Sequence, residues 1–440
     1  MKPFAIQSIF ARRVWDSRGR PTVEAEVTLH DGAMGRAIAP AGASKGTREA
    51  LELRDGGDRF GGLDVMQAVG HVNGEISKAL VGTRADNQSA LDQALIELDG
   101  TVNKSRLGAN ATLAVSMAAA HAMAAASDMP LYRYLGHGKI GRLPMPQIQI
   151  FGGGAHAGRR VDVQDFMVVC PGATSFAQAL EWTAEVYRHA GWLMAQRGSM
   201  FGVADEGGWW PDFASNEQAL EMLVLAIERA GFIPGDQVAI ALDIAASEFG
   251  QQGQYRLGLE SRALDSDGMI EMLLGWVGKY PIVSIEDPLA EDDPVGFARF
   301  TQAIGDRLQI VGDDFLVSNS KLIREAAQMG AANTVLLKPN QQGTLSETLQ
   351  AWQVAKEMGY SAIVSARSGE TEDTTIVDLA MAWDVGQLKV GSFARSERMV
   401  KWNHALRIEE QLGAQASFAG GSVFRKAPRR TSSEQRLALP

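Results

Sequence analysis

VAIALD at residues 238–243 is the first of five short apolar runs that each carry a charged side chain at or next to their end. The others are IVSIED at 282–287, LQIVGDD at 308–314, TVLLK at 334–338 and GQLK at 386–389. Their charged residues lie 43, 27, 25 and 51 positions apart, and a sixth run, AIVSARS, divides the longest interval. One strand and one helix with their loops take roughly 25 to 30 residues. The spacing therefore predicts a β/α barrel with one longer insertion.

The charged residues of these runs are expected to meet, because barrel strands bring their C-terminal ends to one mouth. Asp243, Glu286 and Asp313 offer only oxygen ligands, which suit Mg²⁺ better than zinc. The ordinary alternative is three solvated loop acids. Carboxylates gathered at an apolar rim repel one another, however, unless a cation neutralises them. The runs therefore predict a magnesium site.

Lys338 and Lys389 belong to the same predicted opening. A single lysine after a strand most simply forms a rim salt bridge. Two lysines beside a divalent cation repel each other, and the cation also favours the neutral amine, so we expect a lowered lysine pKa in the range of a general base. Such a base can remove a proton α to a carboxylate when a cation holds the negative charge that develops.

The chain of 440 residues is longer than a barrel of about 250, so two domains are expected. Residues 1–135 combine an alternating stretch, PTVEAEVTL, with helix-period segments near 64–80, 89–98 and 110–126, which predicts an N-terminal α+β domain. The barrel is expected over 136–426. Residues 427–440 have little to bury, and we expect a mobile tail.

Composition narrows the class of protein. A net charge of −10 argues against a nucleic-acid binder, which needs a basic face. The single cysteine, Cys170, excludes an intrachain disulfide, and the first residues do not resemble a signal peptide, so a cytoplasmic protein is expected. The best membrane candidate, residues 111–126, contains His121 and is short for a span, which favours a buried helix and no membrane contact.

Several motifs carry a resemblance to a known family. They include DSRGRPTVE, GASKGTREALELRDG, LGANATLAVS, ADEGGWWP, ALDIAASEF, YPIVSIEDPLAEDD, QIVGDDF, LLKPNQQGTLSE, SARSGETEDT, GQLKVG and RSERMVKWNHALRIEEQLG. Over roughly residues 4–426 the chain resembles enolase, the phosphopyruvate hydratase family. The resemblance implies an α/β fold, an enolase-type barrel with an N-terminal α+β capping domain, homodimers or larger assemblies, and two Mg²⁺ per active site.

The resemblance also implies roles for individual residues. Asp243, Glu286 and Asp313 match the ligands of the tighter Mg²⁺, and Ser44 matches the lid serine that binds the second. The remaining matches are Lys338 as the base, Lys389 as the partner of the substrate carboxylate, Glu206 as the acid assisting departure of the β-hydroxyl, His156 on the loop that closes over substrate, and Arg367 with Ser368 as the phosphate-binding pair.

Two departures from the family pattern touch the reaction itself. Asp165, in QDF, stands where enolases carry glutamate, which draws the catalytic carboxylate back by one methylene. Ala366, in SARS, stands where enolases carry histidine, so an imidazole is lost near the reacting atoms. Because a proton donor must lie within about 3 Å, these changes are expected to impair dehydration and to enlarge the pocket.

Other departures add charge or aromatic surface. Lys45, Arg159 and Arg160 place extra cations in two loops and are candidate substrate-binding residues, although solvated charges are the ordinary alternative. Trp209 and Trp210 offer flat surfaces on which a base could stack, or they are simply core residues.

Three interpretations follow, all with a small phosphorylated carboxylate as substrate. The favoured one is a specialised paralogue similar to the carboxyphosphonoenolpyruvate synthases of phosphinate pathways, with a nucleotide-activated phosphonate as the second substrate. The alternative is a glycolytic enolase that dehydrates 2-phosphoglycerate to phosphoenolpyruvate. A non-catalytic binding protein fits less well, because the ligand and lysine positions are all kept.

Overall fold

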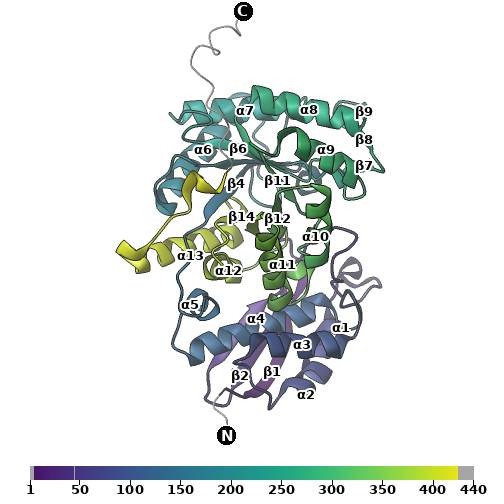
Figure 1. Ribbon diagram of the computed structural model, residues 1–440, viewed down its shortest axis with the longest axis vertical. Coiled ribbons are helices and arrows are strands. Elements are labelled where there is room, and N and C mark those ends of the chain that lie inside the picture. The colour runs from purple at the N-terminus through teal and green to yellow at the C-terminus, as the bar shows by residue number, and fades with distance from the viewer. Residues whose placement is uncertain (1–3, 44, 425–440) are drawn as a thin grey trace, which may run out of the picture.

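Eight strands close into a barrel in the computed structural model, which describes residues 4–43 and 45–424 (Figure 1). Around the barrel they follow the order β10, β11, β12, β13, β14, β4, β5 and β6. The strands are β4 Met145–Gly152, β5 Asp165–Val169, β6 Ala239–Asp243, β10 Ile282–Glu286, β11 Gln309–Gly312, β12 Thr334–Leu337, β13 Ser361–Ser365 and β14 Gln387–Ser392. The predicted barrel is therefore confirmed, with strands at all six of the predicted runs.

Helices cover the outside of the barrel, as the alternating pattern requires (Figure 1). They are α6 Phe176–Gln196, α7 Asn216–Arg229, α8 Ser266–Lys279, α9 Pro294–Ile304, α10 Ser320–Met329, α11 Leu345–Glu357, α12 Thr375–Ala382 and α13 Ser396–Leu412. Short helical turns are η3 Gly154–Ala157, η4 Ala246–Glu248, η5 Pro339–Gln341, η6 Gly413–Gln415 and η7 Gly420–Val423. The predicted insertion after Asp243 is a small antiparallel sheet of β7 Gly250–Gln251, β8 Gln254–Leu257 and β9 Arg262–Asp265.

One strand runs against the simple strand-helix repeat. β5 pairs antiparallel with both β4 and β6. Residues 153–164 connect β4 to β5 with only the turn η3, and a parallel pair needs a longer crossover, usually a helix. The reversal brings Asp165, the first residue of β5, into register with Asp243, the last residue of β6. The start of β5 thus lies at the same mouth as the ends of its neighbours.

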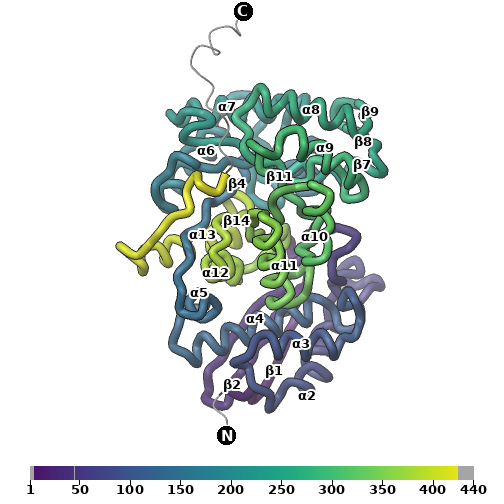
Figure 2. The backbone as a smooth tube through the Cα atoms, viewed as in Figure 1, coloured from purple at the N-terminus to yellow at the C-terminus, as the bar shows by residue number. Residues whose placement is uncertain are grey.

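The smaller domain lies below the barrel in Figure 1 and contains an antiparallel sheet of β1 Ile6–Trp15, β2 Pro21–Leu29 and β3 Met34–Ile38. Its helices are α1 Met66–His71, η2 Val72–Ile76, α2 Ser77–Leu80, α3 Gln88–Asp99, α4 Ala109–Ala126 and α5 Leu131–Leu135, with the turn η1 Arg59–Gly62. The chain then passes from α5 to β4 and enters the barrel (Figure 2).

Helix α4 is the segment with the length and hydropathy of a membrane span, yet 83% of it is buried inside the protein. It packs on β2 and β3. A Cβ atom on Gly35 would lie 2.1 Å from the backbone nitrogen of Ala122, so this close approach requires glycine on β3. The interpretation of α4 as a buried core helix is confirmed.

The two domains meet at the segment that follows Lys338. Asp92 on α3 accepts hydrogen bonds from the Ser346 backbone N–H at 2.8 Å and from its hydroxyl at 2.6 Å. Thr112 on α4 donates to the carbonyl of Gly343 at 2.8 Å. Gly343 lies between η5 and α11, and Ser346 is the second residue of α11, so the smaller domain holds the segment that follows Lys338 in place.

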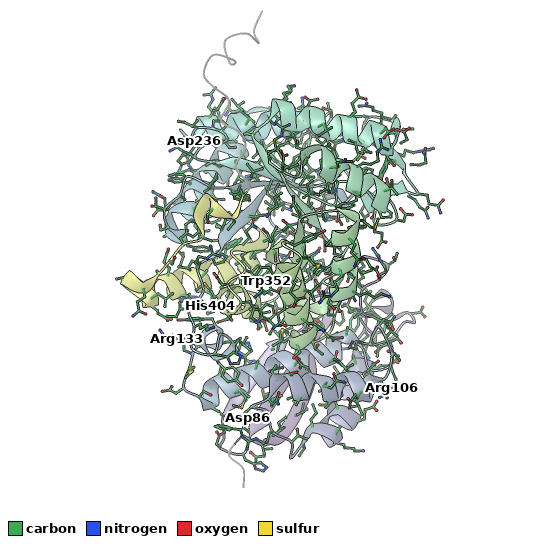
Figure 3. The ribbon with its side chains drawn as sticks, in the orientation of Figure 1. Asp86, Arg106, Arg133, Asp236, Trp352 and His404 are labelled. Atoms are coloured by element: carbon green, nitrogen blue, oxygen red, sulfur yellow. The ribbon has the colours of Figure 1, made fainter. Side chains whose placement is uncertain are left out.

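We predict that Asp92→Ala lowers the free energy of unfolding by about 2–4 kcal/mol, because it removes a fully buried acceptor from the N–H and the hydroxyl of Ser346. Thermal and urea unfolding measure the loss. The control is Asp86→Ala, which removes only the exposed pair with Arg84 and should cost less than about 1 kcal/mol. Asp86 lies at the outer end of the smaller domain (Figure 3). Equal losses in both variants would contradict the proposed domain contact.

Candidate active site

A cavity opens at the barrel mouth and collects most of the residues singled out in the sequence. Its lining residues are His156, Gln164, Asp165, Glu206, Asp243, Lys338, Ser365, Ala366, Arg367, Ser368, Lys389, Val390 and Gly391. Glu286 and Asp313 adjoin it through ion pairs with Lys389 and Lys338, respectively. Ser44 lies outside the described residues, so its position is not part of this description.

Lys389, in the middle of β14, lies among three carboxylates. Its Nζ is 2.8 Å from Asp243 Oδ2, 2.9 Å from Glu286 Oε2 and 3.2 Å from Asp165 Oδ2. These acids come from the mouth ends of β6, β10 and β5. The topology of the barrel therefore assembles the cluster from four strands.

Lys338 follows β12 and forms the second buried pair, donating from Nζ to Asp313 Oδ2. Asp313 also accepts a hydrogen bond from Gln341 Nε2 at 2.9 Å. Gln341 belongs to η5, the turn that directly follows Lys338. The turn thus orients the carboxylate opposite the lysine.

The pKa of each of these lysines is set by the acids around it. Burial alone would lower the pKa of Lys338, but the negative charge of Asp313 outweighs burial, and the pKa is raised. For Lys389, the charges of Asp243 and Glu286 likewise overcome burial and raise the pKa well above its usual value. The lowered pKa is predicted beside a bound cation and stays a prediction for that state.

The donor set fits a hard cation. Asp243, Glu286 and Asp313 are at most 4% exposed, and they supply carboxylate oxygens only. Burial and the charge of Asp243 raise the pKa of Glu286 well above its usual value, even with Lys389 adjacent. Glu286 therefore gains from more positive charge than Lys389 supplies. Asp243, Glu286 and Asp313 are not among the described groups of three whose ligand atoms all lie within 4.8 Å of one another, so their role as a metal-ligand set stays a prediction.

A second acidic group lies beside this set, and the sequence motifs did not single it out. Oxygens of Asp287, Asp313 and Asp314 lie within 4.8 Å of one another. Asp287 accepts the backbone N–H groups of Asp313 and Asp314, each at 2.8 Å, so it fixes the loop that carries Asp313. The doubled acids in IVSIED and LQIVGDD are its only trace in the sequence.

Arg367 and Ser368 face the smaller domain, and Arg367 contacts a loop of that domain. Its guanidinium donates to Glu49 at 3.0 and 3.2 Å and to Asn340 Oδ1 at 2.9 Å. Glu49 was not predicted as a site residue, although it belongs to the motif GASKGTREALELRDG. An anion is thus already bound by the guanidinium that we expect to receive phosphate.

His156, Asp165 and Glu206 form the remaining side of the cavity, with one ligand atom of each within 4.8 Å of the others. His156 Nε2 lies 3.6 Å from Glu206 Oε1. Burial would raise the pKa of Glu206, but the charge of His156 and of the nearby cations outweighs it, and the pKa is lowered. Glu206 is therefore held as a carboxylate opposite the two lysines.

Family models match nearly the whole chain. The model of the enolase C-terminal TIM barrel domain matches residues 141–427, and that of the enolase N-terminal domain matches residues 6–135. The chain belongs to the enolase family. Its barrel and its second domain are those of this family, and its acidic clusters could hold the metal ion that enolases use.

Three basic residues that depart from the family pattern, Lys45, Arg159 and Arg160, lie outside the cavity lining. Lys45 pairs with Glu52 at 2.6 Å. Arg159 pairs with Glu248 at 2.7 Å and Arg160 pairs with Asp212 at 2.6 Å, and both arginines are largely exposed. The structure does not bring these three residues to the other predicted site residues, so their role in substrate binding stays a prediction.

The ring of Trp209 packs against another side chain of the protein. Its ring stacks on Tyr187 with centroids 4.8 Å apart, and its Nε1 donates to the Tyr187 carbonyl at 2.9 Å. Trp210 is half-buried, with its ring tip near Gly158. For Trp209 the packing alternative is therefore correct, and this stack fixes the loop that carries Glu206.

We predict that Asp243→Asn weakens Mg²⁺ binding at least about 10-fold, because it removes one anionic oxygen from the ligand set. Isothermal titration calorimetry with Mg²⁺ alone measures the change. The matched variant is Asp314→Asn, which alters only the neighbouring acidic group and should leave the affinity within about threefold of wild type. The reverse result would place the cation at Asp287, Asp313 and Asp314 instead.

Proposed function

We propose that this enolase-family enzyme acts on a 2-phosphoglycerate or phosphoenolpyruvate type of substrate and uses Lys338 as its base. The observation that carries the proposal is the placement of Lys338, Lys389 and Arg367 around one buried cavity with the three carboxylates. Small anionic phosphorylated carboxylates match this combination of ammonium, guanidinium and metal-binding groups.

Each residue then has a defined task. Arg367 binds the phosphate, with Ser368 next to it in the lining, and Lys389 orients the substrate carboxylate. Lys338 takes the proton α to that carboxylate once its own pair with Asp313 is relieved. Asp243, Glu286 and Asp313 would hold one Mg²⁺ and Ser44 would help to hold a second, and the bound metal would neutralise charge on the substrate carboxylate. Two ions per site, a homodimer or larger assembly and a cytoplasmic location belong to the same proposal.

The side of the cavity that Asp165 and Ala366 line supports a changed reaction. Ala366 lines the cavity with a methyl group only, and the shortened Asp165 is engaged by Lys389. Protons that would assist departure of a β-hydroxyl therefore have fewer carriers. We propose a specialised paralogue similar to carboxyphosphonoenolpyruvate synthase, in which an enolpyruvate unit reacts with a nucleotide-activated phosphonate.

A second candidate is a glycolytic enolase. It is favoured by the retention of Glu206 and His156 side by side in the lining, with Glu206 held as a carboxylate. These two residues are sufficient to form a proton-transfer pair on the hydroxyl side. The rate at which the protein dehydrates 2-phosphoglycerate separates the two candidates.

We predict that Lys338→Ala lowers turnover at least about 10³-fold, because no other lining amine lies beside Asp313 to take the proton. Mg²⁺ affinity should be kept or increased, since the ammonium group no longer competes for Asp313. Exchange of the α-proton of 2-phosphoglycerate with deuterated solvent and Mg²⁺ titration measure the two effects. Lys321→Ala, at a highly exposed lysine, is the control. Unchanged exchange in Lys338→Ala would remove Lys338 from the base role.

We predict that the wild-type protein dehydrates 2-phosphoglycerate at least about 10²-fold more slowly than an ordinary enolase, the low end for a lost acid-base contribution. Ala366→His should raise this rate by restoring an imidazole. Ala366→Leu adds similar bulk without a titratable group and should not. Phosphoenolpyruvate absorbance follows all three proteins. A wild-type rate in the ordinary enolase range would instead establish the glycolytic function.

A further inference from the structure

Gln149 on β4 touches both acidic segments on the hydroxyl side of the cavity. Its Nε2 donates to Asp165 Oδ1, and its Oε1 accepts the backbone N–H of Gly208 at 2.9 Å. Gly208 lies two residues after Glu206, in the loop that carries this acid. The side chain is only 1% exposed. One amide therefore links the Asp165 carboxylate to the Glu206 loop.

The orientation and the length of this amide are both fixed. The Gly208 N–H can only donate and the carboxylate can only accept, so the two partners allow a single orientation of the amide. A Cβ atom on Gly208 would lie 2.4 Å from Gln149 Oε1, and one on Gly152 would lie 3.0 Å from it. The amide thus fills a space that two glycines leave open, with no room for a longer group.

The rest of the loop that carries Glu206 is held by β14 and α6. The Ser392 hydroxyl donates to the Gln149 carbonyl, and the Ser392 N–H donates to the Glu206 carbonyl at 2.9 Å. Tyr187 donates from its hydroxyl to the Gly207 carbonyl at 2.8 Å. These backbone contacts anchor the loop, whereas Gln149 alone among them also reaches an acidic side chain of the cavity.

We propose that Gln149 is a positioning residue that sets the distance between Asp165 and Glu206, and that its length is matched to the short side chain of Asp165. Asp165 Oδ1 is held by Gln149 while Oδ2 faces Lys389 at 3.2 Å, so the carboxylate is fixed between an amide and an ammonium group. The catalytic consequence rests on the proposed function, whereas the length match between the two side chains does not.

The test shortens the side chain at 149 by one methylene and lengthens the side chain at 165 by one methylene. Gln149→Asn is too short to reach Asp165, and Asp165→Glu overfills the space in front of the amide, so each single variant should be less stable than wild type. The double variant Gln149→Asn with Asp165→Glu restores the total length of the contact. Its melting temperature should lie closer to wild type than that of either single variant, which is a positive coupling between neighbours.

The matched control uses Gln147, a buried glutamine two residues earlier on β4 that donates to Gln387 instead of a cavity acid. Gln147→Asn combined with Asp165→Glu should show no recovery. Recovery in this control, or none in the Gln149 pair, would overturn the length match. The melting temperatures are measured without substrate, so they test the length match even if the proposed function is wrong.

The catalytic arm separates positioning from simple destabilisation. With 2-phosphoglycerate as the probe, Gln149→Asn should lower kcat for dehydration about 10-fold or more while KM and α-proton exchange stay within about threefold, because both lysines are kept and Lys389 retains its pairs with Asp243 and Glu286. The double variant should recover kcat. Parallel loss of exchange and dehydration would show a merely structural role and overturn the proposal. If wild type shows neither process, the function proposed for the site fails while the melting data still decide the length match.

Discussion

The balance between buried carboxylates and buried lysines at the barrel mouth is the constraint on which the rest of the site depends. Isolated charges at this depth would be strongly unfavourable, and one unpaired partner left behind would destabilise the fold. Lys389 among Asp165, Asp243 and Glu286, and Lys338 with Asp313, offset part of the negative charge of these four carboxylates. The same pairs oppose metal binding, so a cation must compete with each ammonium group. Metal binding and release of a neutral lysine are therefore linked through shared carboxylates.

The topology of the barrel determines which acidic side chains lie close to Lys389. A parallel β5 would begin at the far end of the barrel, and Asp165 would be remote from Lys389. The reversal of β5 instead places Asp165 in register with Asp243. The connection that permits the reversal, residues 153–164, also carries His156. One short loop thus delivers an acid to the cluster and a histidine to the cavity.

Much of this arrangement is readable from the sequence, because strand spacing and terminal charges are local patterns. The ends of β6, β10 and β12 and the charges beside them follow directly from their runs. The reversed strand and the position of Gln149 do not, since both depend on pairing between segments distant in the chain. The pairing of Lys338 with Asp313 also depends on a distance in space that no spacing along the chain contains.

The departures from the family pattern separate into two kinds once their contacts are known. Arg160 with Asp212 joins the loop of His156 to the segment after Glu206, and the stack of Trp209 on Tyr187 braces the same segment. Arg160 and Trp209 thus brace the walls of the site, and a role of Lys45, Arg159 and Arg160 in substrate binding stays a prediction. Asp165 and Ala366 are different, because both line the cavity itself. These two positions carry the argument for the changed reaction that we propose. In that proposal they would affect how the species formed by the base is used, while both lysines are kept.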